Sequence, residues 1–418
     1  MNSPILIKKN DKFFVEDVCI DSIIEKFATP AYIYSKQRIV DNFKNLESAF
    51  KNVDHMICFA VKANSNIAIL NLLAKNGAGF DIVSGGELRR VIAADGDPKK
   101  IVFSGVGKTS EEIKLAIENN ILAFNIESED ELSRIQEIAK SLNKKASISI
   151  RVNPDVNANT HPYISTGLKE NKFGVSEESA LNLYKKAKTM DSILIKGIDC
   201  HIGSQITDIK PFEDSVKKLI ALIDKLEIEG IKIKHMDIGG GIGISYEDEK
   251  TIAFDDYAKA VSSLTKGRDF KILLEPGRVI MADAGAILSK VEYVKRTQDK
   301  NFAIIDAAMN DLMRPSLYGA FHKILNSSQT TEKESVFDIV GPICETGDFI
   351  GKDRVISIEP DNILVIMDTG AYAMSMSSNY NSRPRLHELM IDKDKIHMIR
   401  EKESFDDLIK GEKILPES

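Results

Sequence analysis

Eight short apolar runs, each followed by a segment with helical spacing, constrain the fold of this sequence more than any other feature. The runs are ICFAVKA (57–63), GFDIV (79–83), IVFSGV (101–106), LAFNIE (122–127), ASISIRV (146–152), IKGIDCHIG (195–203), HMDIGGG (235–241) and KILLEPGR (271–278). Between them, segments such as NIAILNLLAKNG and DSVKKLIALIDKL carry apolar residues at the spacing of an amphipathic helix. Such a series of strand–helix units favours a closed (β/α)8 barrel, and an open doubly wound sheet is the alternative.

Three of the intervening segments carry the residue pair of a helix capping box. The pairs are Ser84 with Glu87, Thr109 with Glu112, and Ser128 with Glu131. In a capping box the hydroxyl and the carboxylate each accept a hydrogen bond from an otherwise unpaired amide of the first helical turn. The pairs therefore predict helix starts directly after three of the strands.

The alternation of strands and helices ends near residue 285. The later segments AILSKVEYVKRT, NFAIIDAAM, SVFDIVGPIC, RVISIEP, NILVIMDTG and HELMIDKDKIHMI are strand-like, and KKNDKFFV near the N-terminus is typical of a hairpin. We therefore expect an α/β protein with two domains. Residues 30–284 would form the barrel, and residues 1–29 with 285–418 would form a second, mostly β domain.

Composition favours a cytoplasmic protein that acts on small molecules. The net charge is −7, and because acidic and basic residues are interspersed, nucleic acid and membrane surfaces are not expected partners. The four cysteines are scattered without a CxxC pair, which fits a reducing compartment. The start, MNSPILIKKND, has no apolar core of a signal peptide, and no later stretch is apolar enough for a membrane helix.

Chemically active side chains gather at the ends of the eight runs. Because the active site of a barrel of this kind lies at the C-terminal ends of its strands, these residues are candidates for a shared site. They are Lys62, Asp81, Ser84, Arg151, His201, Gly239, Gly240, Gly241, Gly243, Glu275 and Arg278. Taken alone, Lys62 has a plain alternative as a strand-end lysine whose stem reaches solvent.

The GGGIG segment at the end of the seventh run is a candidate phosphate site. Glycines let backbone amides approach an anion closely, and barrels commonly bind phosphate after strands seven and eight. A tight turn without a ligand is the alternative. Two nucleotide motifs are excluded, because GVGKTS has Val102 where a P-loop needs glycine and GGGIGI has Ile244 where GxGxxG needs its last glycine.

A lysine, a phosphate-binding turn, a histidine and a carboxylate together suggest pyridoxal phosphate. This cofactor binds covalently to a lysine amine, and it needs donors for its phosphate and a partner for its pyridine nitrogen. Glu275 suits that nitrogen, and His201 suits stacking on the ring. His201 and His235 lack the spacing of metal ligands, so no metal is expected.

Several motifs taken together resemble the diaminopimelate decarboxylase family, which uses pyridoxal phosphate on an alanine-racemase-like barrel. They are FAVKAN, HIGSQ, GGGIG, EPGR, RPSLYGA, CETGD and GAY, in the family's order between about residues 30 and 386. The resemblance implies decarboxylation of meso-diaminopimelate to L-lysine and CO2, the last step of lysine biosynthesis. It also implies a homodimer with shared active sites.

The resemblance assigns a role to each candidate residue. Lys62 would carry the cofactor, and Lys62, His201 and Cys344 would be catalytic, with the proton donor open among Cys344, Lys62 and a water. Other cofactor contacts would be Asp81, Arg151, Ser204, Gly239, Gly240, Gly241, Glu275, Gly277, Arg278 and Tyr372. Substrate contacts would be Arg278, Arg314, Tyr318, Tyr372 and Glu345, with Cys344 and Glu345 reaching across from the partner subunit.

Three alternatives share parts of this pattern. A related decarboxylase of ornithine, arginine or carboxynorspermidine would use the same barrel, but Arg314 and Tyr318 favour a substrate with a distal carboxylate. An alanine racemase pairs the pyridine nitrogen with arginine, which disagrees with Glu275. A regulator that has lost its cofactor would not need Lys62, His201 and Glu275.

Overall fold

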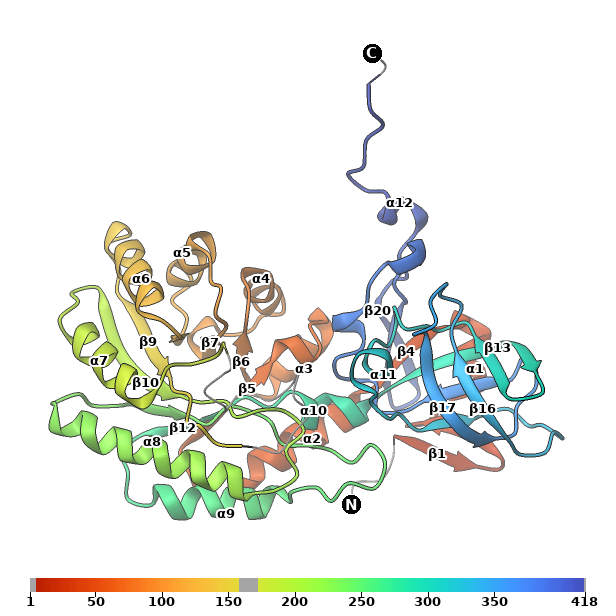
Figure 1. Cartoon of the computed structure of the whole chain (residues 1–418), viewed down its shortest axis with the longest axis horizontal. Helices are drawn as coiled ribbons and strands as arrows, with labels where there is room; N and C mark the ends of the chain where they lie inside the picture. The colour runs from red at the N-terminus through yellow and green to blue at the C-terminus, as the bar shows by residue number, and fades with distance from the viewer. Residues whose placement is uncertain (1–4, 158–171, 417–418) are drawn as a thin grey trace. The chain divides into compact units, whose positions relative to one another are not determined.

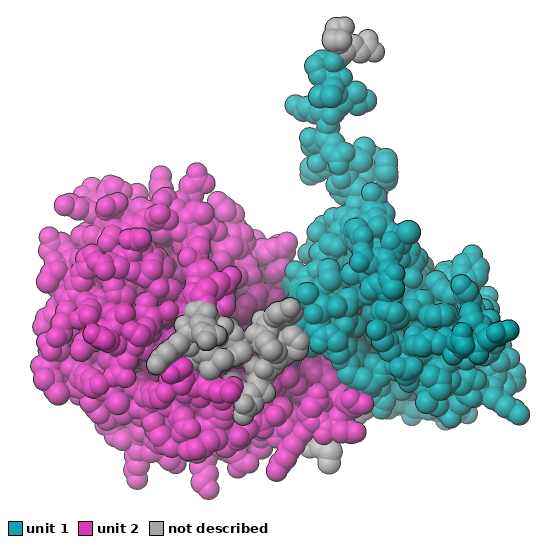
Figure 2. Space-filling model, in the orientation of Figure 1, with its two compact units in different colours: residues 1–39, 281–418 teal, residues 40–280 magenta. Residues whose placement is uncertain are grey.

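The computed structural model describes residues 5–157 and 172–416 and divides into two compact units. We call Val40–Ile280 the barrel unit, and we call Met1–Ile39 with Met281–Ser418 the β unit (Figure 2). Chain segments from both ends contribute strands to the β unit, as the sequence predicted.

Eight parallel strands close into a barrel in the order β10-β11-β12-β5-β6-β7-β8-β9. The ring closes where β12 pairs with β5, with Ile272 opposite His55. This confirms the (β/α)8 barrel and excludes the open sheet. The strands are β5 His55–Ala60, β6 Gly79–Ile82, β7 Ile101–Phe103, β8 Ala123–Ile126, β9 Ala146–Arg151, β10 Ile193–Asp199, β11 His235–Asp237 and β12 Lys271–Leu274.

Helices lie on the outer side of the barrel strands (Figure 1). They are α2 Lys36–Ala49, α3 Ile67–Lys75, α4 Gly85–Ala93, α5 Ser110–Glu118, α6 Glu129–Ser141, α7 Glu177–Lys188, α8 Lys210–Ile228 and α9 Phe254–Thr265. In α8, Leu219, Leu222 and Leu226 are buried on one stripe, so apolar burial fixes the helix against its neighbours. None of the helices in the described ranges is long and apolar enough to cross a membrane.

The three expected helix starts all carry a side-chain cap. At α5 the box is reciprocal, since Thr109 accepts from the Glu112 amide and Glu112 accepts from the Thr109 amide. At α4 and α6 the serine side chain caps the helix as expected. The glutamate, however, accepts a hydrogen bond from the backbone amide of the residue before the serine. In all three cases the first turn is fixed directly after a strand, which fixes the direction of the strand's last side chains.

A nine-stranded sheet dominates the β unit, with strand order β17-β16-β14-β13-β4-β19-β20 and with β18 pairing β13 and β15. Its strands are β4 Ala31–Ser35, β13 Gly285–Arg296, β14 Asn301–Ile305, β15 Ile324–Asn326, β16 Ser335–Val340, β17 Phe349–Ile356, β18 Ile363–Ile366, β19 Glu388–Asp392 and β20 Lys395–Arg400. Alternate residues of three adjacent strands share one apolar core: Ala31, Ile33, Ala286, Leu288, Leu389 and Ile391. The later segments of the chain are therefore strands, as predicted.

The remaining elements of the chain are short. A three-stranded sheet joins β1 Leu6–Lys9, β2 Lys12–Val15 and β3 Val18–Cys19, and the predicted hairpin is confirmed because Lys9 pairs with Lys12. Asn10 and Asp11 in its turn both have positive φ, as a two-residue hairpin turn requires. The remaining helices are α1 Ile20–Phe27, α10 Arg278–Met281, α11 Arg314–Tyr318 and α12 Phe405–Leu408.

The expected domain boundaries at residues 30 and 284 differ slightly from the division by contacts. Residues 31–35 form β4, which pairs with β13 and β19 in the nine-stranded sheet and so belongs to the β unit. The apolar run AYIYS resembles the barrel runs, which is why the sequence did not separate them. The division into a barrel domain of residues 30–284 and a β-rich domain of residues 1–29 with 285–418 stays a prediction.

Candidate active site

Lys62 lies in a short turn, Val61–Ala63, directly after β5. The residues before it are buried, whereas the lysine side chain is 40% exposed, so its stem leaves the core at the barrel end. Its Nζ donates to Oδ2 of Asp81 at 3.0 Å. Asp81 comes from the neighbouring strand β6 and is completely buried. The hydrogen bond between the ends of these two adjacent strands thus fixes the direction of the Lys62 amine.

Arg151, the last residue of β9, is buried among carboxylates. Its guanidinium lies 3.3 Å from Glu127 and 3.9 Å from Asp199. Burial alone would lower the pKa of Arg151, but Glu127 and Asp199 raise it overall. Arg151 is therefore a fixed positive charge inside the barrel end.

His201 follows β10 and is held by the glycine turn. The Gly240 amide donates to Nδ1 of His201 at 3.2 Å, and because an amide is always a donor, Nδ1 carries no proton. Desolvation, with the charges of Arg151 and Lys62, lowers the pKa of His201 well below its ordinary value. The ring is therefore neutral, with its proton on Nε2.

The glycine turn after β11 brings backbone into contact with backbone. Gly239 and Gly241 have φ of 68° and 106°, and a Cβ on Gly240 would lie 2.1 Å from the carbonyl oxygen of Glu275. A small hollow is lined by Gly239, Gly240, Gly241 and Gly277 together with apolar side chains. A side chain at these positions would collide with the neighbouring backbone. The close approach of the two backbone segments therefore requires glycine here.

Arg278 and Ser204 meet at the same end of the barrel unit. The Arg278 guanidinium is buried and donates to Tyr246 at 2.7 Å and to Ser204 at 3.0 Å. Sequence reasoning missed Tyr246, because a tyrosine in a loop carries no distinctive spacing. These two hydrogen bonds fix the plane of the Arg278 guanidinium. One of them goes to Tyr246, which belongs to the chain segment that follows the glycine turn.

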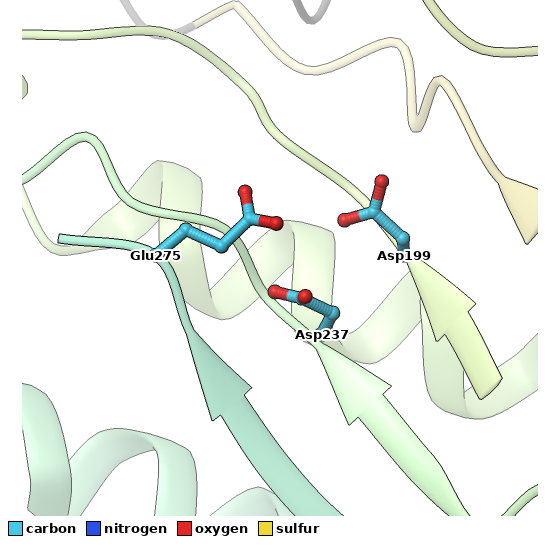
Figure 3. Close-up of side chains that lie close together, drawn as sticks. All are labelled: Asp199, Asp237 and Glu275. Atoms are coloured by element: carbon cyan, nitrogen blue, oxygen red, sulfur yellow. The ribbon is translucent and has the colours of Figure 1, made fainter. Parts of the chain in front are cut away.

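Glu275 follows β12 and lies in a buried polar cluster. Asn125 and Ser104 donate to its Oε1 at 3.4 and 3.5 Å. Burial first, and then the negative charges of Asp237 and Asp81, raise the pKa of Glu275 well above its ordinary value. Asp199 and Asp237, which end β10 and β11, point toward Glu275 (Figure 3). Both were missed, although an acid at the end of an apolar run was the signal that identified Asp81.

Carboxylate oxygens of Asp199, Asp237 and Glu275 lie within 4.8 Å of one another, a spacing at which a metal ion is sterically possible. Arg151 lies beside Asp199, Lys62 acts on Glu275, and burial raises the pKa of all three acids. The cluster is therefore suited to holding protons. The expectation that the site needs no metal stays a prediction.

These residues fit pyridoxal phosphate. An amine reaches the barrel end at Lys62, and a small hollow lies beside the glycine turn, whose backbone packs so closely that a Cβ on Gly239 would lie 2.7 Å from the Cys200 carbonyl oxygen. Glu275 is a buried acid with a raised pKa, which suits a ring nitrogen, and His201 is a neutral flat ring. The Gly239 and Gly240 amides are exceptions, because they already donate to Asp237 and His201.

The other candidates lie in the β unit. Arg314 and Tyr318 bound the short helix α11, and Arg314 is buried. Its guanidinium donates to Nε2 of His322 at 2.8 Å, and Nδ1 of His322 donates to the Met367 carbonyl at 2.9 Å. Sequence reasoning missed this histidine. The completely buried His322 fixes the direction of Arg314.

Cys344 and Glu345 lie on an exposed loop of the β unit. The Cys344 amide donates to Oδ1 of Asn381 at 2.9 Å, and the Tyr380 hydroxyl donates to Oε2 of Glu345 at 2.8 Å. Tyr372, also in the β unit, has a φ of 56°, which is rare for a tyrosine and is a common sign of a functional position. The candidates thus form two sets, one at the barrel end and one in the β unit.

Comparison with known proteins gives one consistent family. Residues 36–282 match the model described as "Pyridoxal-dependent decarboxylase, pyridoxal binding domain". A diaminopimelate decarboxylase from Pseudomonas aeruginosa is 48% identical over 98% of this chain and 99% of the relative.

Solved structures agree with this family. A diaminopimelate decarboxylase from M. jannaschii with L-lysine superposes with a TM-score of 0.93 at 41% identity, covering 98% of both chains. The one from Helicobacter pylori with L-lysine gives 0.91 at 45% identity, covering 93% of this chain and 98% of that one.

Proposed function

The chain belongs to the pyridoxal-dependent decarboxylases and, within them, to the diaminopimelate decarboxylases, and from this premise we infer that it removes CO2 from meso-diaminopimelate to give L-lysine. The cofactor is pyridoxal phosphate. The reaction makes the chain a carboxy-lyase of lysine biosynthesis.

One observation in the molecule supports this conclusion more than any other. The amine of Lys62, the neutral ring of His201, the glycine turn and the buried acid Glu275 occupy the ends of β5, β10, β11 and β12 on the same side of one closed barrel. Each answers one need of pyridoxal phosphate. A barrel that binds another phosphorylated ligand would have no need of both a reachable amine and a buried acid.

We assign the residues of the barrel end as follows, as part of this proposal. When bound, pyridoxal phosphate supplies an aldehyde that links to an amine and a ring that accepts electrons from the substrate's α-carbon. Lys62 would hold the aldehyde carbon, Glu275 would hold the proton at the ring nitrogen, and His201 would stack on the ring. Asp81 and Arg151 would orient Lys62 and balance charge. Ser204, Gly241, Gly277, Arg278 and Tyr372 would donate to the phosphate, and Gly239 and Gly240, whose amides donate to Asp237 and His201, would form the turn beside it.

The distal end of the substrate requires a separate set of charges. Diaminopimelate has a carboxylate and an ammonium far from the reacting carbon, so selective binding needs cations as well as an acid. We propose that Arg278, Arg314, Tyr318 and Tyr372 bind the carboxylate and that Glu345 binds the ammonium. A substrate without the distal carboxylate would lack the proposed hydrogen bonds with the Arg314 guanidinium, at a cost of about 3 kcal/mol, which is roughly a hundredfold in kcat/KM.

We also infer a cytoplasmic homodimer with shared sites. The inference is supported by the four free cysteines, which fit a reducing compartment, and by the exposure of Cys344 and Glu345 on their loop. Mixing Lys62→Ala and Glu345→Ala subunits tests the sharing. If each site takes residues from both subunits, random mixing restores about a quarter of wild-type activity. No gain on mixing would contradict shared sites.

The assignment is tested by the choice of substrate. Purified protein with pyridoxal phosphate should release CO2 from meso-diaminopimelate much faster than from lysine, ornithine or arginine. The rival is a decarboxylase of ornithine or a similar substrate, which has the same fold but no need of Arg314. Preference for ornithine would show that the protein is this other decarboxylase. In that case Arg314→Leu should have little effect on activity, which provides a matched check.

A further inference from the structure

Three acids from adjacent strands meet beneath the candidate active site. Asp199 ends β10, Asp237 ends β11, and Glu275 follows β12. All three are buried, with exposed fractions of 1%, 0% and 7%. Their carboxyl groups point toward one another (Figure 3), with oxygens of all three within 4.8 Å. Such a contact places negative charges together in a region that water does not reach.

The charges facing Asp237 do not balance. The cation among them is Arg151, which is already paired with Glu127 and also lies near Asp199. The other titratable groups that interact with Asp237 are Cys58, Asp81, Asp199, Cys200, Tyr257 and Glu275. Lys62 adds a positive charge at Glu275 but is paired with Asp81, so the acids still outnumber the cations among these described groups and the cluster gains from keeping a proton.

The two oxygens of Asp237 have different surroundings. Oδ1 accepts from the Gly239 amide at 2.9 Å, and the next amide of this turn, that of Gly240, donates to His201. Oδ2 is buried, and within the described residues it receives no hydrogen bond. The Asp237 carboxyl group points toward that of Glu275, with oxygens of the two groups within 4.8 Å (Figure 3). Because two carboxylates contain no donor, a hydrogen bond between them requires a proton on one of them.

Burial is consistent with a retained proton. Burial above all, and also the charge of Asp81, raises the pKa of Asp237 to about 7, although the Gly239 amide opposes the shift. Burial likewise raises the pKa of Glu275 well above its ordinary value. A carboxylic acid kept neutral near pH 7 can donate a hydrogen bond, which an ionised one cannot.

We propose that Asp237 is a positioning residue with two functions: Oδ1 holds the glycine turn against His201, and the carboxyl group shares one proton with Glu275. The shared proton gives Glu275 a defined charge and direction toward the cofactor's ring nitrogen. The proposal deepens the proposed function and rests on it for the role of Glu275. The geometry of the acid pair itself does not depend on any cofactor.

The first test uses cofactor-free protein and the variant Asp237→Asn. Asparagine keeps an acceptor for Gly239 and offers an amide donor to Glu275, but it cannot titrate. The pKa of Asp237 is raised above its unfolded value of 3.8, so its contribution to stability is lost as pH rises toward and through about 7. We therefore compare the midpoints of thermal unfolding of Asp237→Asn and wild type at each pH. The midpoint of the variant minus that of wild type should increase by several degrees from about pH 5.5 to pH 8.

Two further variants identify the partner of the proton. In a Glu275→Gln background the same comparison should show a smaller pH trend, because the glutamine amide can donate to Asp237 in place of the shared proton, while burial still raises the pKa of Asp237. An unchanged trend in that background would show that the proton is not shared with Glu275. Asp199→Asn is the matched control, and the proposal is overturned if it flattens the pH dependence while Asp237→Asn does not.

Infrared spectroscopy covers the case in which the variants fail to fold. Wild-type protein near neutral pH should show the carbonyl stretch of a protonated, buried carboxylic acid, which should disappear at higher pH. Absence of this band below pH 7 would overturn the proposal.

A last comparison separates the two functions of Asp237. Asp237→Asn should bind pyridoxal phosphate about as tightly as wild type. The pH dependence of the bound cofactor's visible absorbance should differ between this variant and wild type. Asp237→Ala should weaken cofactor binding about tenfold, which is about 1.4 kcal/mol, since the Gly239 amide loses its acceptor. Equal effects of both variants would contradict the separation. Wild type without activity on diaminopimelate would instead refute the proposed function.

Discussion

The Lys62 ammonium lies 3.0 Å from the Asp81 carboxylate, and the two residues come from the ends of adjacent barrel strands. Asp81 is completely buried, whereas the Lys62 side chain is 40% exposed. The lysine therefore neutralises a buried acid while its amine stays within reach of small molecules. This relationship makes Lys62 both a structural and a chemical residue.

Removing the lysine should destabilise the cofactor-free protein. Lys62→Ala leaves Asp81 buried without this cation, and we expect a loss of about 1–2 kcal/mol, less than for a fully buried pair because Lys62 is half exposed. Adding Asp81→Asn should recover most of that loss, since the buried charge is then absent. Urea unfolding of both single variants and the double variant measures the coupling, and additive effects would show that the pair does not interact.

Glu275→Gln should lower kcat by about 100- to 1000-fold while the protein keeps its cofactor, because an oriented charge in a buried site is lost without a change of shape. The variant's cofactor content is read from its visible absorbance, and kcat is measured at saturating diaminopimelate. Asp130→Asn, an exposed acid on α6, is the matched control and should behave as wild type. Full activity in Glu275→Gln would remove Glu275 from the reaction.

Acid should weaken the barrel through His235. Burial lowers the pKa of His235 from 6.5 to about 4, with its Nε2 2.8 Å from the Ser149 hydroxyl. The unfolded chain thus binds more protons between these values, and stability falls as pH falls through that range, by about 2 kcal/mol from pH 7 to pH 5.

His235→Gln should remove this part of the pH dependence in urea unfolding of the cofactor-free protein. The exposed His397 on β20 provides the control, and His397→Gln should leave the pH dependence as in wild type. If His235→Gln shows the full wild-type slope, the acid sensitivity arises elsewhere.

Tyr380→Phe should impair substrate binding through Glu345. The lost hydroxyl donates to the Glu345 carboxylate at 2.8 Å, and because Tyr380 is 44% exposed we expect only a modest rise in KM for diaminopimelate, of roughly a few-fold. kcat should change little. Tyr293→Phe, an exposed tyrosine of β13, is the control, and an unchanged KM in Tyr380→Phe would show that Glu345 needs no such support.

The sequence was most informative about the barrel. Eight apolar runs predicted eight strands, and helix caps such as Thr109 predicted where helices begin, because both signals are local. Lys62, Asp81, Arg151 and Glu275 were found because each ends an apolar run, where polar side chains are unexpected. β4 was not separated from the barrel, because an apolar strand does not reveal which sheet it will join.

What the sequence did not reveal depends on contacts between distant segments. His322 supports Arg314, and Tyr246 supports Arg278 from 32 residues away, without any spacing that marks them. Asp237 was passed over although it ends a run, since the glycines after it drew the interpretation toward phosphate. Its importance becomes visible only when Asp199 and Glu275 are placed beside it.

Covalent attachment of the cofactor to Lys62 is the central claim, and it is tested most directly by trapping that bond. Protein loaded with pyridoxal phosphate is reduced with borohydride, digested and analysed by mass spectrometry, with Lys62→Ala treated in parallel. We predict one modified peptide, carrying the pyridoxyl mass on Lys62 and missing from the variant. Modification of another lysine in the wild type, or none at all, would contradict the account.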